Sequence, residues 1–351
     1  MAVLIGVDAH KRTHTLVAVD EVGRKLAERT VQATSEGHLN AVQWAGQWSD
    51  VSFAVEDCRH MTRRLEQDLI KMGFRVIRVH TRFMATARRS GRQPGKSDPI
   101  DALAVAHAAL REPDLPVAAL DGPSRQVKLL FDHRHDLILE RTKVINRLRW
   151  HVHELDPQLT IPPRGLRSYS TMDSVAAHLE GFSGTVARIA DDLLARCREL
   201  TRQVNQLERE LRDLVRILAP SLLAIPGCGV LSAAAIIGET ATASRFRSKD
   251  AYARFTGTAP IPVWSGNNVK VRLNRGGNRT LNHALHTIAV TQARGSGRGK
   301  TYYDGLTARG KTRKEALRLL RRRLSDVVLR ALLADERTRT QPATNTGQEA
   351  A

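Results

Sequence analysis

The feature that most constrains the fold is the order in which strand and helix patterns alternate from residue 3 to residue 110. Three short strand-like segments, with a turn over residues 20–23, predict three antiparallel strands at the start of the chain. The predicted strands cover residues 3–8, 15–19, 25–33, 51–55 and 74–79, and the predicted helices cover residues 38–48, 59–72 and 99–110. This β-β-β-α-β-α-β-α order predicts a mixed sheet with helices on its faces.

Four acidic residues stand at the ends of these elements. The element order is that of the ribonuclease-H-like fold, in which the first and fourth strands are adjacent, so Asp8 and Glu56 at their ends are expected to face each other. Asp98 and Asp101 share one face at the start of a helix that packs against the same edge. Carboxylates so close repel one another unless a cation lies between them, and such oxygen ligands select Mg²⁺ or Mn²⁺. The acids therefore predict a two-metal site for phosphodiester chemistry.

Each acid also has a structural interpretation when it is taken alone. Asp8 would be a turn residue at a strand end, and Glu56 a surface acid beside Asp57. Asp98 would cap its helix, with Asp101 in the favourable first turn. Asp57 also competes with Glu56 for the site, because neighbouring strand residues point to opposite faces and the sequence leaves the register open.

The chain beyond residue 112 has a mainly helical pattern. An amphipathic helix is predicted over residues 125–150, and a second helix carries apolar residues at alternating intervals of three and four, which is a heptad seam. The seam consists of Ala190, Leu193, Cys197, Leu200, Val204, Leu207, Leu211, Leu214 and Leu218. The sequence leaves open whether this coiled coil pairs between chains or folds back on the first helix.

The charge is strongly basic, since 55 Lys and Arg against 36 Asp and Glu give a net charge of +19. Residues 267–340 hold 18 basic and 5 acidic residues, interleaved with apolar ones at helical spacing. This pattern favours a nucleic-acid surface over a solvated or disordered basic tail. The sequence has no membrane span, export signal or cysteine framework, so we expect a cytoplasmic, nucleoid-associated protein without membrane partners.

Two sets of motifs resemble one known family. IGVDAHK, FAVED and KSDPIDA, at residues 5–11, 53–57 and 96–102, resemble the acidic motifs of the DEDD-type transposases of the insertion sequence 110 family. The C-terminal segments LAIPGCGVLSAAAIIGE and RFTGTAPIPVWSGNNVKVRLNRGGNRTLNHAL resemble the second conserved region of the same enzymes. The resemblance covers roughly residues 3–332 and implies a DNA transposase with a Holliday-junction-resolvase-like N-terminal domain.

The resemblance also implies a domain organisation. The expected parts are a catalytic domain over residues 1–112, a helical coiled-coil region over 113–219 and a mostly helical transposase domain over 220–335. The residues that follow, 336–351, are expected to form a disordered tail because they end in a run rich in Thr, Gln, Ala and Gly. Carried over by motif, the metal-binding acids are Asp8, Glu56, Asp98 and Asp101, and the nucleophile is Ser265. Taken alone, the Ser-Gly-Asn-Asn run that begins at Ser265 is above all a turn.

A serine nucleophile needs positive charge around its phosphate. Ser244, Ser248 and Thr256 are weaker candidates than Ser265, because none lies in a basic turn next to glycine. The residues expected to contact nucleic acid are Lys11, Lys270, Arg272, Arg275 and Arg279.

The partners follow from the same resemblance. Members of the family use donor DNA, target DNA and a structured non-coding guide RNA, the bridge RNA, that pairs with both. Recombination joins two duplexes, so a dimer or tetramer is expected. The alternative enzyme is a metal-dependent Holliday-junction resolvase or nuclease without a covalent intermediate. The non-enzymatic alternative is a nucleic-acid-binding protein whose acids are structural.

Overall fold

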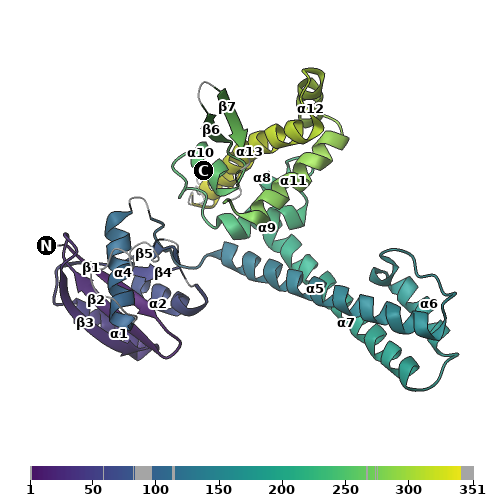
Figure 1. Ribbon diagram of the computed structural model, residues 1–351, viewed down its shortest axis with the longest axis horizontal. Coiled ribbons are helices and arrows are strands. Elements are labelled where there is room, and N and C mark those ends of the chain that lie inside the picture. The colour runs from purple at the N-terminus through teal and green to yellow at the C-terminus, as the bar shows by residue number, and fades with distance from the viewer. Residues whose placement is uncertain are drawn as a thin grey trace, which may run out of the picture. The chain divides into compact units, whose positions relative to one another are not determined.

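The computed structural model describes residues 2–57, 59–81, 83, 97–112, 115–265, 268–272, 274 and 276–340, without the side chains of residues 59–60, 264–265 and 268–272. The chain divides into two compact units, Met1–Asp121 and Gly122–Ala351 (Figure 1). None of the described helices combines the length and the apolar character that crossing a membrane requires.

The N-terminal unit is built on a five-stranded sheet with the order β3-β2-β1-β4-β5. β1 runs antiparallel to β2 and parallel to β4, so the sheet is mixed, as predicted. The strands are β1 (Ala2–Ala9), β2 (Thr13–Val19), β3 (Lys25–Gln32), β4 (Asp50–Glu56) and β5 (Arg75–Val79), and the helices are α1 (Ser35–Ala45), α2 (Arg59–Lys71) and α4 (Asp98–Arg111). The predicted element order is confirmed, with boundaries shifted by at most three residues.

Strand alternation divides the core of this unit into two layers. Val3, Ile5 and Val7 of β1 pack with buried residues of α1 and α2 on one face of the sheet. Leu4 of β1 and Ala54 of β4 pack with the alanine-rich α4 on the other face (Figure 1). Even-numbered residues at the ends of β1 and β4 therefore face α4.

Helix α4 approaches β1 closely because Gly6 has no side chain. A Cβ atom at Gly6 would lie 2.1 Å from the carbonyl oxygen of Ala102 and 2.9 Å from the Cβ of Ala106. Glycine in β1 and alanines in α4 thus let strand and helix backbones pack directly against each other. This contact fixes the position of the start of α4 relative to the end of β1.

The second unit begins with a long helical hairpin. Helices α5 (Pro123–Leu155) and α7 (Thr185–Leu218) pack side by side, with α6 (Tyr169–Leu179) at their connection. Seam residues of α7, among them Cys197, Leu200 and Val204, are buried with Leu137 and Leu148 of α5. Of the two partners that the sequence left open for the seam, the structure of this chain has the intramolecular one.

The rest of this unit forms a second helical core (Figure 1). Its elements are α8 (Pro220–Leu223), α9 (Val230–Thr240), α10 (Lys249–Phe255), strands β6 (Ile261–Ser265) and β7 (Asn268–Arg272), α11 (Arg279–Arg294), α12 (Arg298–Ala308) and α13 (Arg313–Thr340). Because α13 continues to Thr340, residues 336–340 are helical, which corrects the predicted start of the disordered tail at residue 336. Residues 341–351 lie outside the described residues.

Candidate functional site

The register of the sheet brings the first two predicted acids to one face. Val7 of β1 lies opposite Val55 of β4, so the next residues, Asp8 and Glu56, are neighbours on adjacent parallel strands. Both are even-numbered and face α4, as Leu4 and Ala54 do. Asp57 has the opposite parity, so the geometry favours Glu56 for the site.

The other two acids lie in the first turn of α4. Ser97 is the N-cap residue of this helix, with Pro99 following Asp98, so the interpretation of Asp98 as the cap is wrong. Asp98 is exposed, whereas Asp101 is only 6% exposed. The close packing of α4 on Gly6 holds this turn against the end of β1.

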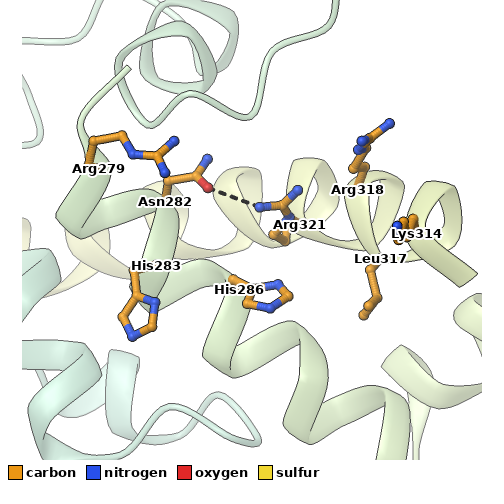
Figure 2. Close-up of a pocket in the computed structure, with 8 residues that line it drawn as sticks. All are labelled: Arg279, Asn282, His283, His286, Lys314, Leu317, Arg318 and Arg321. Atoms are coloured by element: carbon orange, nitrogen blue, oxygen red, sulfur yellow. Dashed lines mark hydrogen bonds between the residues drawn. The ribbon is translucent and has the colours of Figure 1, made fainter. Parts of the chain in front are cut away.

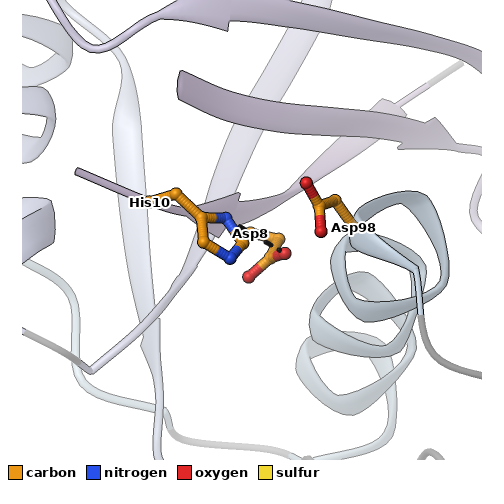
Figure 3. Close-up of side chains that lie close together, drawn as sticks. All are labelled: Asp8, His10 and Asp98. Carbon is orange, nitrogen blue, oxygen red and sulfur yellow. Dashed lines mark ion pairs between the residues drawn. The ribbon is translucent and has the colours of Figure 1, made fainter. Parts of the chain in front are cut away.

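Asp8 lies at the centre of the resulting cluster. One ligand atom each of Asp8, His10 and Asp98 lies within 4.8 Å of the others, and Figure 3 shows the three side chains together. The Asp8 Oδ2 atom is 3.5 Å from His10 Nδ1. Asp8 is 7% exposed, and this oxygen accepts no hydrogen bond within the described part of the chain.

Burial and the acids around Asp8 shift the pKa of its carboxyl group. Burial raises the pKa of the Asp8 carboxyl from 3.8 to about 6, and repulsion by Asp101, Asp98 and Glu56 adds to the rise, whereas His10 opposes it. The other three predicted acids therefore lie close enough to Asp8 to raise its pKa. A cation between them would remove the repulsion.

His10 was not predicted as a site residue. It follows Asp8 by two residues, which places both on the same side of an extended segment. This spacing of two residues, within the segment IGVDAHK, was the sequence feature from which His10 could have been predicted. An imidazole nitrogen beside carboxylates suits Mn²⁺ as well as harder cations.

The donor set fits a divalent metal ion. Carboxylate oxygens are the ligands of Mg²⁺ and Mn²⁺, and the buried Asp8 oxygen without a hydrogen-bond donor has the character of a ligand atom. Asp8, Asp98 and His10 would hold the ion, with Asp101 and Glu56 next to them.

The predicted nucleophile belongs to a β-hairpin of the second unit. Ser265 is the last residue of β6 and pairs with Asn268, the first residue of β7. The sequence predicted a turn here but not the two strands. The side chains of Ser265, Lys270 and Arg272 lie outside the described residues, as does Arg275. Of the other predicted contact residues, Lys11 is exposed after β1 and Arg279 is exposed at the start of α11.

The base of this hairpin is held by a close contact between two glycines. A Cβ atom at Gly277 would lie 2.2 Å from the Cα of Gly257, which itself has a positive φ of 70°. The backbone N–H of Asn278 donates to the carbonyl of Phe255 at 2.8 Å. The turn before β6 and the turn after β7 are therefore joined through their backbones.

A partly buried polar network anchors the second of these turns. Lys128 Nζ of α5 donates to Glu239 Oε1 of α9 at 2.6 Å, and Asn278 Nδ2 donates to Glu239 Oε2 at 2.6 Å. The hydrogen bonds of Glu239 and Asp132 raise the pKa of Lys128 against the effect of its burial. Asn278 in turn accepts a hydrogen bond from the Leu281 N–H and caps α11. Three helices thus fix where the hairpin returns to the core.

Comparisons with known proteins identify the class. A sequence model described as "Transposase" matches residues 5–157. A second, described as "Transposase IS116/IS110/IS902 family", matches residues 219–304. The matched segments contain the four acids and the hairpin with Ser265, so the chain is a transposase. It belongs to the IS116/IS110/IS902 family.

Relatives are similar over nearly their full length. An uncharacterized 44.8 kDa protein of insertion element IS116 from Streptomyces clavuligerus is 26% identical over 392 residues, which cover 97% of this chain and 98% of the relative. An uncharacterized 42 kDa protein of insertion element IS900 from Mycobacterium paratuberculosis is 26% identical with the same coverage. Among solved structures, T. thermophilus RuvC in complex with a Holliday junction substrate matches 34% of this chain and 100% of its own, with 15% identity and a TM-score of 0.27.

Proposed function

We propose that this transposase cuts and exchanges DNA strands with the metal-binding acids around Asp8 and with Ser265 as the nucleophile. The observation that carries the proposal is the gathering of carboxylates from β1, β4 and α4 around one buried oxygen of Asp8. Carboxylates in such an arrangement are unfavourable without a cation, so a site of this kind is suited to metal binding.

The N-terminal unit would supply the metal site. Asp8, Glu56, Asp98 and Asp101 would hold Mg²⁺ or Mn²⁺, with His10 as a further ligand. The bound ions would neutralise the charge that develops on the phosphate and on the departing oxygen. The chain's own contribution is rigidity, because the contact of Gly6 with Ala102 fixes the ligands of α4 against those of β1.

The second unit would supply the nucleophile. The Ser265 Oγ–P bond forms as a P–O bond of the DNA breaks, the serine loses its proton and the departing deoxyribose oxygen gains one. A hydroxyl group of a second strand then attacks the phosphoserine, which restores the serine and joins the new strands. The acids and Ser265 belong to different units, so both units, of one protomer or of two in a dimer or tetramer, would act on the same phosphate.

Sequence selection would come from a guide RNA. The excess of basic residues over positions 267–340 provides the charge for a polyanion in addition to the DNA. Inspection of the DNA that flanks the gene for a segment able to fold and to pair with donor and target tests this part of the proposal.

A suicide DNA substrate tests the chemistry. With Mg²⁺, the wild-type protein is expected to accumulate a protein–DNA adduct whose peptide map contains Ser265, and the variants Ser265→Ala and Asp8→Asn are expected to bind DNA without forming it. Ser248→Ala, which removes a cap hydroxyl of α10, serves as the matched serine control and should still form the adduct. Cleavage without an adduct would instead support the junction-resolvase alternative, and an adduct at another residue would refute the role of Ser265.

A further inference from the structure

A pocket of about 290 Å³ lies between α11 and α13 and is lined mainly by basic side chains (Figure 2). Arg279 and Asn282 come from α11, and Lys314, Arg318 and Arg321 come from α13. No carboxylate lines this pocket within the described part of the chain. The pocket therefore concentrates positive charge.

Arg322, the next residue of α13, has acidic partners, whereas the basic residues of the pocket have none among the described residues. Arg322 forms ion pairs with Asp250, at 2.5 Å, and with Asp326. As far as the structure describes the chain, no acidic side chain lies within 4.0 Å of the charged groups of the four pocket cations, Arg279, Lys314, Arg318 and Arg321. Glu315, on the wall of an adjoining cavity, binds the backbone and hydroxyl of Thr312 instead.

The pocket cations repel one another. Burial lowers the pKa of the Arg321 guanidinium, and the charge of Arg318 lowers it further. Burial also lowers the pKa of His286 on the wall of the pocket, as do Arg321 and His283. A bound anion would relieve this repulsion.

Arg321 is held in one orientation by a relay of hydrogen bonds. Its Nη1 donates to Asn282 Oδ1 at 2.9 Å, the bond drawn in Figure 2. Asn282 Nδ2 donates to the carbonyls of Thr256 and Gly257, both at 3.1 Å, in the turn before β6. The Nε of Arg321 is buried and has no hydrogen-bond partner among the described residues. The guanidinium is therefore held by the base of the hairpin, and the hydrogen-bonding capacity of its Nε–H is not satisfied by the described residues.

The spacing on α13 fits a strand better than a single ion. Lys314, Arg318 and Arg321 follow one another by four and three residues, so they lie on one face and extend along about 10 Å of the helix. That length corresponds to about three nucleotides of one DNA strand at 3.4 Å each. We propose that this pocket binds the sugar–phosphate backbone of a nucleic-acid strand, with Arg318 and Arg321 on one phosphate and Arg279 and Lys314 on its neighbours. The proposal rests on the proposed function and adds a binding site tied to the hairpin of Ser265.

Equilibrium binding without chemistry tests the proposal. Fluorescence anisotropy with a labelled DNA oligonucleotide is measured for the full chain in EDTA, in a Ser265→Ala background, so that failure of the serine chemistry has no effect on the result. Arg318→Gln and Lys314→Gln replace exposed side chains and should leave the melting temperature unchanged. Arg330→Gln, an exposed site on the same helix outside the pocket, is the matched charge control.

The salt dependence gives the expected signature. Each pocket variant should weaken binding by about tenfold near 0.1 M salt and lower the slope of log K against log[salt] by about 1, because one phosphate contact is lost. Arg330→Gln should keep the wild-type slope. Equal slopes for the pocket variants and the control would overturn the proposal. Competition by inorganic phosphate gives a second test. If millimolar phosphate displaces the DNA completely, and to the same extent from the wild type and the pocket variants, the pocket binds free phosphate or no anion at all. That result would overturn the proposal as well.

Discussion

Replacing Asp8 with Asn removes one charge from the acidic cluster while it keeps the size of the side chain. In the metal-free protein, the carboxylate of Asp8 is held in an unfavourable place, because its pKa rises from 3.8 to about 6 on folding. The folded state therefore binds a proton more tightly than the unfolded chain. Stability is lost as the pH rises from about 4 to about 6, and the full penalty remains at higher pH.

The size of the effect follows from the shift. Two pKa units correspond to an electrostatic penalty of about 3 kcal/mol. The variant should recover about 1 to 3 kcal/mol of this penalty, and not always all of it, because the buried amide of Asn also needs hydrogen bonds. For a unit the size of Met1–Asp121, this predicts a rise in melting temperature of roughly 3 to 10 °C at pH 8 in EDTA. The gain should shrink as the pH falls and vanish near pH 4.

Differential scanning calorimetry in EDTA and in Mg²⁺ measures both the destabilisation by the Asp8 charge and its relief by the metal. Saturating metal should stabilise the wild-type protein, by about 2.7 kcal/mol at a concentration of 100 Kd, and stabilise Asp8→Asn much less, so the difference between them should shrink or reverse. Asp50→Asn, an exposed acid at the first residue of β4, is the control and should change neither transition.

Two outcomes would refute the reasoning. If Asp8→Asn melts at or below the wild-type temperature in EDTA at pH 8, the carboxylate is not under electrostatic strain. If Mg²⁺ raises the melting temperature of both proteins equally, the cluster around Asp8 is not where the metal binds.

Two further predictions use buried features of each unit. Burial and the neighbouring His38 and His10 lower the pKa of His14 to about 4, so the stability that the neutral imidazole contributes is lost as the pH falls from 6.5 towards 4. His14→Phe should therefore reduce the loss of stability over this pH range. An unchanged pH dependence would contradict the lowered pKa of His14. Gly277→Ala should lower the free energy of unfolding of the second unit by about 1 to 3 kcal/mol, because the new Cβ would clash with Gly257. Gly276→Ala is the control and should cost less than about 1 kcal/mol, because its Cβ would meet only Asn274 Oδ1 at 3.5 Å. Equal denaturation midpoints for the two variants would refute the close contact.

The N-terminal unit could be predicted well because its strands carry their own pattern. Most of these strands are largely apolar runs, separated by turn residues, and such runs define strands without knowledge of their partners. The choice between Glu56 and Asp57 could not be made from the sequence, because it depends on the pairing of Val7 with Val55 across two strands. His10 was missed for a similar reason, since a lone histidine becomes significant only beside Asp8 in space.

The second unit was harder to predict because its interactions are between distant helices. The seam of α7 indicated a partner helix but not which one, since leucines at heptad spacing fit any similar surface. Strands β6 and β7 were not predicted, because each is only five residues long and the Ser-Gly-Asn-Asn run where they meet has the composition of a loop. Arg318 and Arg321 were not singled out within the basic region, because the pocket that they form with Asn282 of α11 depends on the packing of two helices.

The helical hairpin sets a rule for how the length of this protein can change. Helices α5 and α7 run through both cores of the second unit, since Val127 and Leu211 belong to one core and Leu137 and Val204 to the other. An insertion in one helix alone would leave one of the two cores out of register. Relatives with a longer or shorter hairpin should therefore differ by seven residues, or a multiple of seven, in both helices at once.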